Sequence, residues 1–196
     1  MILVANHFHF GDPAAIVRCS PRPMEFVGGF RFPFAPRVVH FIPHLWGYIP
    51  AYRGGYSRST LRRALAALGD GKTLALFPEG GAWADVLRPG RPGAAFLALN
   101  SQAQVVPIGI DGITHVFRKW RPQVTIQIGK PIGPFRARPG ATPRQSQGAV
   151  TEQIMRAIAA LIPPERRGVW SEDPAIREAA REVAENPFEK DGLRGL

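Results

Sequence analysis

Three short apolar runs, each followed by residues that favour turns, constrain the fold of this 196-residue chain more than any other sequence feature. The runs cover residues 2–5, 72–77 and 105–110, and they are rich in Val, Ile and Leu. Runs of this length are typical of strands buried on both faces of a sheet. Weaker strand patterns occupy residues 24–27, 47–52 and 124–128. The chain therefore contains the strands of a sheet.

Segments with a helical spacing of apolar residues separate these predicted strands. Helix patterns cover residues 13–18, 61–68, 92–100, 142–161 and 174–185. Strands that alternate with helices predict an α/β fold, in which helices flank both faces of a mostly parallel sheet. Because 45% of the residues are hydrophobic, the chain can bury a core. We expect one domain, with its main body in residues 1–165 and a peripheral helical tail in residues 166–196.

Cysteine content and hydropathy exclude several protein classes. The single cysteine, Cys19, excludes an internal disulfide and a metal site with several cysteine ligands, and it favours a reducing compartment. No apolar run approaches the roughly 20 residues of a membrane-spanning helix, and the N-terminus lacks the pattern of a secretory signal. We expect neither a metal nor a permanently bound cofactor.

Basic charge is concentrated in the main body of the chain. Residues 1–150 contain 18 of the 25 Lys and Arg residues but only 6 of the 15 Asp and Glu residues. A positive surface attracts phosphate, whether on nucleic acid, on anionic lipid or on a substrate. The sequence contains no recognisable nucleic-acid-binding module. We therefore expect no nucleic-acid partner, although a basic nucleic-acid-binding protein remains an alternative.

The segment after the first run, residues 6–13, is the strongest candidate for chemistry. It places an imidazole, His7, five residues before a carboxylate, Asp12. Histidine accepts a proton near neutral pH, and a carboxylate can orient its ring and stabilise the imidazolium. The pair therefore predicts a general base.

Two alternatives apply to this pair. Asp12 is followed by Pro13, so it can instead be a helix N-cap with proline at the first helical position. The other histidine, His9, would point to the same side as His7 in an extended segment.

Four segments in this order resemble the PlsC-type glycerolipid acyltransferases, also called lysophosphatidic acid acyltransferases. The first has Asn6-His7 with Asp12, and the second ends at Arg53 after a strand. The third reads Phe-Pro-Glu-Gly at residues 77–80, and the fourth is the Val-Pro-Ile segment that contains Pro107. The resemblance extends over residues 1–134 and favours His7 over His9 as the base.

This resemblance implies an O-acyltransferase of phospholipid biosynthesis with a glycerol-3-phosphate acyltransferase-like fold in residues 1–165. The enzyme would move a fatty acyl group from acyl-CoA or acyl carrier protein to a hydroxyl of a lysophospholipid such as lysophosphatidic acid. His7 would remove the hydroxyl proton and Asp12 would orient the ring. We expect the protein to lie peripherally at an anionic membrane surface, on the cytoplasmic face.

The other matching residues are expected to bind substrate. They are Arg53, Phe77, Pro78, Glu79, Gly80, Gly81 and Pro107. A guanidinium at position 53 would bind the acceptor phosphate through two oxygens. The two glycines would let backbone amides approach a phosphate or an oxyanion. Because a carboxylate repels phosphate, Glu79 is expected to bind a hydroxyl, a backbone amide or Arg53.

The chain departs from the family pattern in two places. After Gly80 the family usually has Thr/Ser-Arg-Ser, whereas this chain has Gly-Ala-Trp at residues 81–83. Arg88 or Arg91 would have to replace the lost arginine, or the acceptor is a glycolipid or another polar lipid. The family usually has several dozen residues, including membrane-associated helices, before the histidine, whereas this chain begins almost at the motif, so either the start codon is misassigned or this is a minimal form.

The second departure leaves two points open. Without the usual N-terminal helices, the basic main body, Trp46 and the aromatic residues 30–34 are candidates for membrane contact. For the aromatic residues we favour the alternative, which is core or the wall of an acyl-chain tunnel. A first strand that begins at residue 2 also raises the hypothesis of a decayed, inactive family member.

Overall fold

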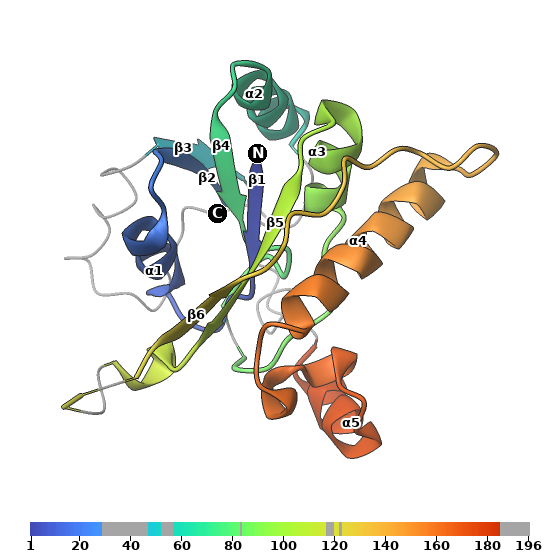
Figure 1. Ribbon diagram of the computed structural model, residues 1–196. Helices are drawn as coiled ribbons and strands as arrows, with labels where there is room; N and C mark the ends of the chain where they lie inside the picture. Colours follow the sequence, from blue (N-terminus) through green and yellow to red (C-terminus); the bar gives the residue numbers. More distant parts are fainter. Residues whose placement is uncertain (29–46, 52–56, 83, 117–119, 122, 185–196) are drawn as a thin grey trace.

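The computed structural model describes residues 1–28, 47–51, 57–82, 84–116, 120–121 and 123–184. Within these residues one six-stranded sheet has the order β3-β2-β4-β1-β5-β6 (Figure 1). The strands are β1 Ile2–Ala5, β2 Met24–Gly28, β3 Gly47–Pro50, β4 Thr73–Leu76, β5 Val105–Asp111 and β6 Thr125–Ile128. Neighbouring strands are parallel, except for the antiparallel pair β5 and β6.

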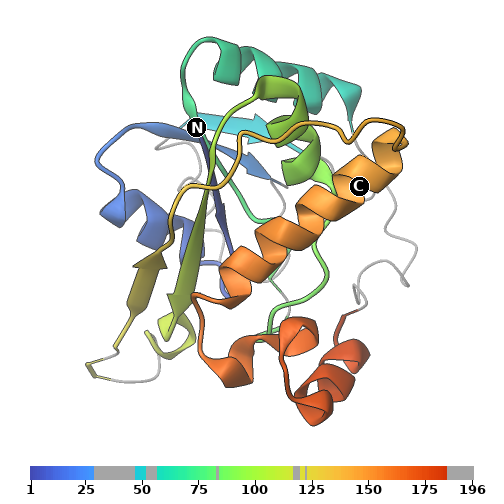
Figure 2. The same cartoon turned by 45° about the vertical axis from the view of Figure 1, so that its right-hand side comes forward.

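Helices connect the strands and cover both faces of the sheet. The α-helices are α1 Asp12–Cys19, α2 Arg58–Gly69, α3 Gly93–Ser101, α4 Pro143–Ala159 and α5 Pro174–Glu182. Short 3-10 helices are η3 Ile113–His115, η4 Pro164–Arg166 and η5 Gly168–Trp170. Helix α1 lies on one face, and α2, α3 and α4 lie on the other (Figures 1 and 2). The predicted α/β architecture with a mostly parallel sheet is therefore confirmed.

The central strand β1 divides its side chains between two hydrophobic cores. Ile2 and Val4 join the core beneath α2, α3 and α4, whereas Leu3 and Ala5 join the core beside α1. All four residues are buried, which follows from the alternation of side chains along a strand with helices on both faces.

The pairing of β1 argues against the hypothesis of a decayed first strand. β1 pairs with β4 on one side and with β5 on the other, so its backbone is hydrogen-bonded along both edges. Because β1, β4 and β5 are parallel, their carboxyl ends meet at one edge of the sheet. In α/β proteins ligand-binding groups concentrate at this edge.

The strand β6 at the far edge of the sheet differs from the others in its direction. β6 runs antiparallel to β5 and is mostly exposed, so it forms the second arm of a hairpin rather than another parallel strand.

No helix among the described residues is long and apolar enough to cross a bilayer.

Candidate active site

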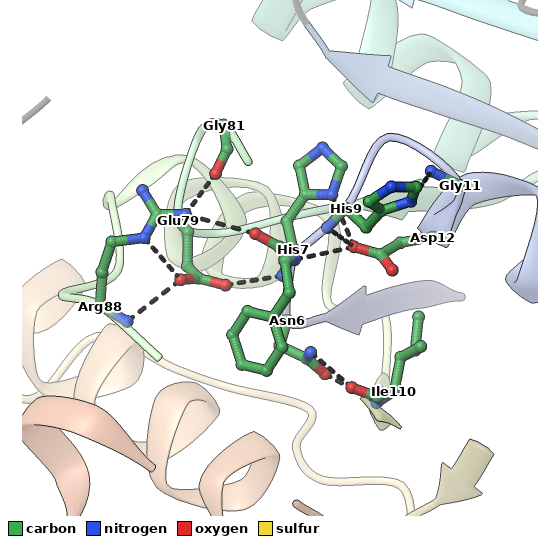
Figure 3. Close-up of polar contacts among 10 residues, drawn as sticks. Asn6, His7, His9, Gly11, Asp12, Glu79, Gly81, Arg88 and Ile110 are labelled. Atoms are coloured by element: carbon green, nitrogen blue, oxygen red, sulfur yellow. Dashed lines mark hydrogen bonds and ion pairs between the residues drawn. The ribbon is translucent and has the colours of Figure 1, made fainter. Parts of the chain in front are cut away.

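The ends of β1 and β4 bring together two segments that lie far apart in the sequence. Val4 is paired with Leu76, and three residues further along each strand the chain reaches His7 and Glu79. The backbone N–H of His7 donates to Oε1 of Glu79 over 2.7 Å (Figure 3). The ring of Phe77 stacks on the imidazole, with 4.0 Å between the ring centroids. The parallel register therefore builds the site.

The carboxylate of Asp12 organises the loop that carries His7. Its Oδ2 atom lies 3.0 Å from Nδ1 of His7 and accepts backbone N–H groups of Phe8 and His9, each over 2.8 Å. Asp12 is completely buried. Because an ionised carboxylate only accepts hydrogen bonds, Nδ1 of His7 is the protonated nitrogen and Nε2 carries the lone pair. In Figure 3 the Nε2 edge of the ring faces away from Asp12.

The alternative role of Asp12 as a helix N-cap is wrong. The N-cap of α1 is Gly11, and Asp12 is the first helical residue, followed by Pro13. The carboxylate turns back toward the amides of the preceding loop instead of forward to those of the helix. Its position in the first turn still favours the negative charge through the helix dipole.

The two histidines have different surroundings. Nδ1 of His9 accepts the backbone N–H of Gly11 over 3.2 Å, and its ring packs on Phe10 with centroids 4.2 Å apart. Burial lowers the pKa of His9, an effect that Asp12 opposes and His7 reinforces. The geometry therefore supports His7 as the base, since its ring nitrogen contacts the carboxylate.

A buried ion pair fixes the backbone of His7 from the other side. Glu79 is 2% exposed, and its Oε2 atom accepts the backbone N–H of Arg88 over 3.0 Å and lies 3.1 Å from Nε of Arg88. The Arg88 guanidinium also donates to the carbonyl oxygens of Gly81 and His7. The N–H and C=O of His7 are thus both bound by this pair (Figure 3).

Burial changes the acidity of both partners. It raises the pKa of Glu79 to about 7, while Arg88 and the amides of His7 and Arg88 pull that pKa down. Burial also lowers the pKa of Arg88, although Glu79 opposes this shift. An ionised Glu79 is consistent with its contacts, because both oxygens accept N–H groups.

Arg88 does not occupy the position expected for an arginine that replaces the lost phosphate-binding residue. It is 1% exposed, and its guanidinium lies against Glu79 and main-chain carbonyls. No sequence signal marks this role, because Arg88 lies in a loop without periodicity. Arg91 remains a candidate for the phosphate, since its side chain lies beside Gly80, where an added Cβ would be 2.8 Å from Arg91 Nε.

The segment 77–81, predicted to bind substrate, mainly makes internal and supporting hydrogen bonds next to His7. Gly80 has a φ of +79° and donates its N–H to the Phe77 carbonyl over 3.1 Å, so a turn uses this amide. The carbonyl of the buried Pro78 accepts the N–H of Arg91, and that of Gly81 accepts Arg88. The expectation that Glu79 binds a backbone amide agrees with the structure.

Two predicted binding residues are not placed with this group. Pro107 is buried inside β5 and paired with Val4, and its carbonyl accepts the N–H of Gly129. Arg53 lies outside the described residues, as do Trp46 and residues 30–34.

Asn6 fastens β1 to β5 directly before His7. Its Nδ2 donates to the Ile110 carbonyl over 2.8 Å, and its Oδ1 accepts the Ile110 N–H over 2.7 Å. The side chain is completely buried. The structure thus gives this residue a role that sequence reasoning did not assign.

The C-terminal segment 164–170 holds the loop that carries Arg88. Leu87 donates its N–H to the Arg166 carbonyl over 2.8 Å and accepts that of Val169 over 3.2 Å. The indole N–H of Trp170 donates to the Arg88 carbonyl over 3.3 Å. This part of the predicted tail therefore contributes to the site's framework, which the sequence did not indicate.

The described residues contain no group of three or more His, Cys, Asp or Glu side chains that could hold a metal ion.

Comparisons with known proteins identify a family and a similar fold. The family model described as Acyltransferase matches residues 1–111, which include His7, Asp12, residues 77–81 and Pro107. A solved structure of the 1-acyl-sn-glycerophosphate (LPA) acyltransferase PlsC from Thermotoga maritima has a similar fold, with a TM-score of 0.56 and 24% sequence identity. The alignment covers 82% of this chain and 64% of that chain. Comparison with curated proteins gave no match.

Proposed function

Because this chain belongs to the acyltransferase family, we propose that it transfers a fatty acyl group from a thioester donor to a hydroxyl of a lysophospholipid such as lysophosphatidic acid. The observation that carries the proposal is the contact of 3.0 Å between Nδ1 of His7 and Oδ2 of the buried Asp12. The name of the similar Thermotoga maritima structure supports this class of acceptor. The donor would be acyl-CoA or acyl carrier protein.

The reaction would proceed by general base catalysis. Nε2 of His7 accepts the proton of the acceptor hydroxyl as its oxygen attacks the thioester carbonyl. The new ester C–O bond forms, the C–S bond breaks, and the proton leaves with the thiolate. Asp12 orients the ring through Nδ1 and stabilises the imidazolium between the two proton transfers. No covalent enzyme intermediate is needed.

The buried pair of Glu79 and Arg88 would serve this step by fixing the main chain. It binds both the N–H and the C=O of His7, so the imidazole starts from a defined backbone position. Stacking on Phe77 restricts rotation of the ring. Such restriction of a reacting group supplies part of the catalytic advantage of an enzyme site.

Cationic side chains would bind the acceptor headgroup. Arg91, next to the Gly80 turn, and Arg53 are the proposed phosphate ligands. A glycolipid or another polar lipid is the alternative acceptor, because the third segment lacks its usual arginine. We place the enzyme peripherally, at the cytoplasmic face of an anionic membrane.

A panel of lysophospholipid and glycolipid acceptors, incubated separately with acyl-CoA and acyl carrier protein, tests the function. Mass spectrometry should detect one acylated product with the wild type and with His9→Ala, but not with His7→Ala. Thioester cleavage should depend on the acceptor. Equal product from His7→Ala and the wild type would refute the proposed role of His7, and thioester cleavage without acceptor would refute transfer to a lipid.

A further inference from the structure

Exposed apolar side chains gather on the hairpin of β5 and β6 and on the loop of His7. Trp120 is 95% exposed and Ile128 61%, while Phe10, Val116 and Val124 are each more than one third exposed. Single exposed apolar residues are ordinary on a protein surface, but a group of them marks an interaction site. We call these five residues together with Arg121 the hairpin surface.

Topology places this surface at the same edge of the sheet as the candidate active site. β5 is parallel to β1, so it leaves the sheet where His7 lies, and the hairpin extends beyond that edge (Figures 1 and 2). The loop and the hairpin lie close together, because an added Cβ on Gly11 would be 3.7 Å from the Ile113 side chain. Phe10 is next to Gly11, so it adjoins the hairpin.

The pattern of β6 turns its apolar residues toward one side. Side chains alternate along a strand, so Val124, Ile126 and Ile128 share a face. Ile126 packs against the core beside α1. The exposed Val124 and Ile128 therefore lie on the α1 side of the sheet, the side of the loop that contains Phe10.

The charge around this face is positive. The sequence has no Asp or Glu between Asp111 and Glu152. Arg121 is exposed, and Asp111 lies 3.7 Å from Arg166, which also pairs with Asp85. An indole beside cations is typical of a protein surface that binds at the boundary between lipid headgroups and acyl chains.

We propose that the hairpin surface docks on an anionic lipid bilayer and thereby turns the His7 edge of the sheet toward the membrane. This inference rests on the proposed function, since a lipid acceptor must reach His7 from the bilayer. A nucleic acid fits less well, because exposed Val and Ile side chains gain nothing from phosphodiesters, and single-strand binding uses a platform of stacked aromatic rings.

Sedimentation with phospholipid vesicles tests the surface directly. The wild type should bind mixed phosphatidylglycerol and phosphatidylcholine vesicles more tightly than vesicles of phosphatidylcholine alone. Trp120→Ala should weaken binding to the mixed vesicles by roughly tenfold or more, through loss of apolar burial. Arg121→Ala should weaken it by about fivefold.

Arg138→Ala is the matched control for charge. Arg138 is exposed, and it follows Ile132, which bridges to Val105 at the opposite end of β5. This variant should bind the mixed vesicles like the wild type. Wild-type binding by Trp120→Ala and Arg121→Ala would overturn the proposal, as would equal losses in Arg138→Ala and Arg121→Ala or a preference for a duplex oligonucleotide over the vesicles.

Activity on a short-chain acceptor, dissolved as monomers, separates this inference from the proposed function. Trp120→Ala and Arg121→Ala should retain acyl transfer there, because no membrane is involved, whereas His7→Ala should lose it. Vesicle binding through the hairpin surface by a wild type without transferase activity would refute the function and leave the docking surface standing. Transfer to the monomeric acceptor by the wild type, together with vesicle binding that neither Trp120→Ala nor Arg121→Ala weakens, would refute the docking surface and leave the function standing.

Discussion

The loop after β1 and the loop after β4 meet at one edge of the sheet but are stabilised in different ways. The first is short, and Asp12, the first residue of the following helix, binds the backbone of Phe8 and His9 and the ring of His7. The second is held from outside, by the ion pair of Glu79 and Arg88 and by the C-terminal segment 164–170. Local contacts thus position the reacting group, and long-range contacts position its support.

Because of this difference, substitutions in the two loops should have different consequences. Damage to the first loop should remove chemistry with little effect on folding, unless a buried acceptor is lost. Damage to the second should lower stability and activity together. Substitutions in each loop can separate the two effects.

The largest effect should follow from His7→Ala. Loss of a general base lowers the rate by about 10² to 10⁴, while the fold should persist because His7 is at the edge of the sheet. His9→Ala is the matched control and should stay within a few fold of the wild type. Acyl-transfer rates with thermal unfolding curves would check both, and equal losses in the two variants would contradict the assignment of the base.

Asp12→Asn should have the next largest effect. The amide keeps one acceptor oxygen for the loop but loses the charge that stabilises the imidazolium, so we expect the rate to fall by at least about 10². Asp70→Asn, on the exposed end of α2, is the control. Acyl-transfer rates and unfolding midpoints of both variants would check this. Full activity in Asp12→Asn would show that the carboxylate is only structural.

Arg88→Met should change stability as well as rate. It leaves Glu79 buried without its cation, which costs about 3–5 kcal/mol of unfolding free energy at a pH where Glu79 is ionised. Arg181→Met breaks an exposed pair with Glu178 and should cost no more than about 0.5 kcal/mol. Urea unfolding measures both, and a similar small loss in the two variants would show that the buried pair does not support the loop.

Gly168→Ala tests the C-terminal support of the second loop. Gly168 has a φ of +53°, and an added Cβ would be 2.1 Å from the Leu87 carbonyl oxygen, so the contact must move. We expect a loss of about 1–3 kcal/mol and a fall in kcat greater than the change in KM.

Gly148→Ala is the matched control, because Gly148 lies inside α4 with open space around its Cβ position. This substitution should be neutral or should stabilise by about 0.5–1 kcal/mol. An unchanged kcat in Gly168→Ala would show that the C-terminal segment does not support the active site.

The last prediction concerns a pH dependence of stability caused by Glu79. Its pKa is raised from 4.5 to about 7, so the folded protein binds this proton more tightly than the unfolded chain does. The free energy of unfolding of the wild type, relative to Glu79→Gln, should therefore fall as the pH rises from 4.5 to about 7 and then level off. Urea unfolding over this range would check the sign, and a rise would contradict it.

The sequence predicts the sheet and the first loop well for a common reason. Buried parallel strands appear as short apolar runs, and His7 and Asp12 are close enough in the chain for their contact to depend on local geometry. The N-cap alternative failed because capping rules describe amides that follow a carboxylate, whereas Asp12 binds amides that precede it.

The support of the second loop could not be predicted in this way. Arg88 meets Glu79 only because the chain turns within an irregular segment, and Trp170 reaches it from 82 residues away. Neither contact leaves a periodic pattern. The exposure of Trp120 also depends on how β6 folds back along β5, which single-residue preferences do not specify.

The paired hydrogen bonds of Asn6 restrict what can stand before the imidazole. Its planar amide offers a donor and an acceptor side by side, in the way that a peptide group of an adjoining strand would. An aspartate would place an oxygen lone pair next to the carbonyl oxygen of Ile110, and the two would repel. The side chain of serine is too short, and that of glutamine too long, to make both hydrogen bonds. The fit at position 6 thus depends on a side-chain amide that imitates the main chain of a neighbouring strand.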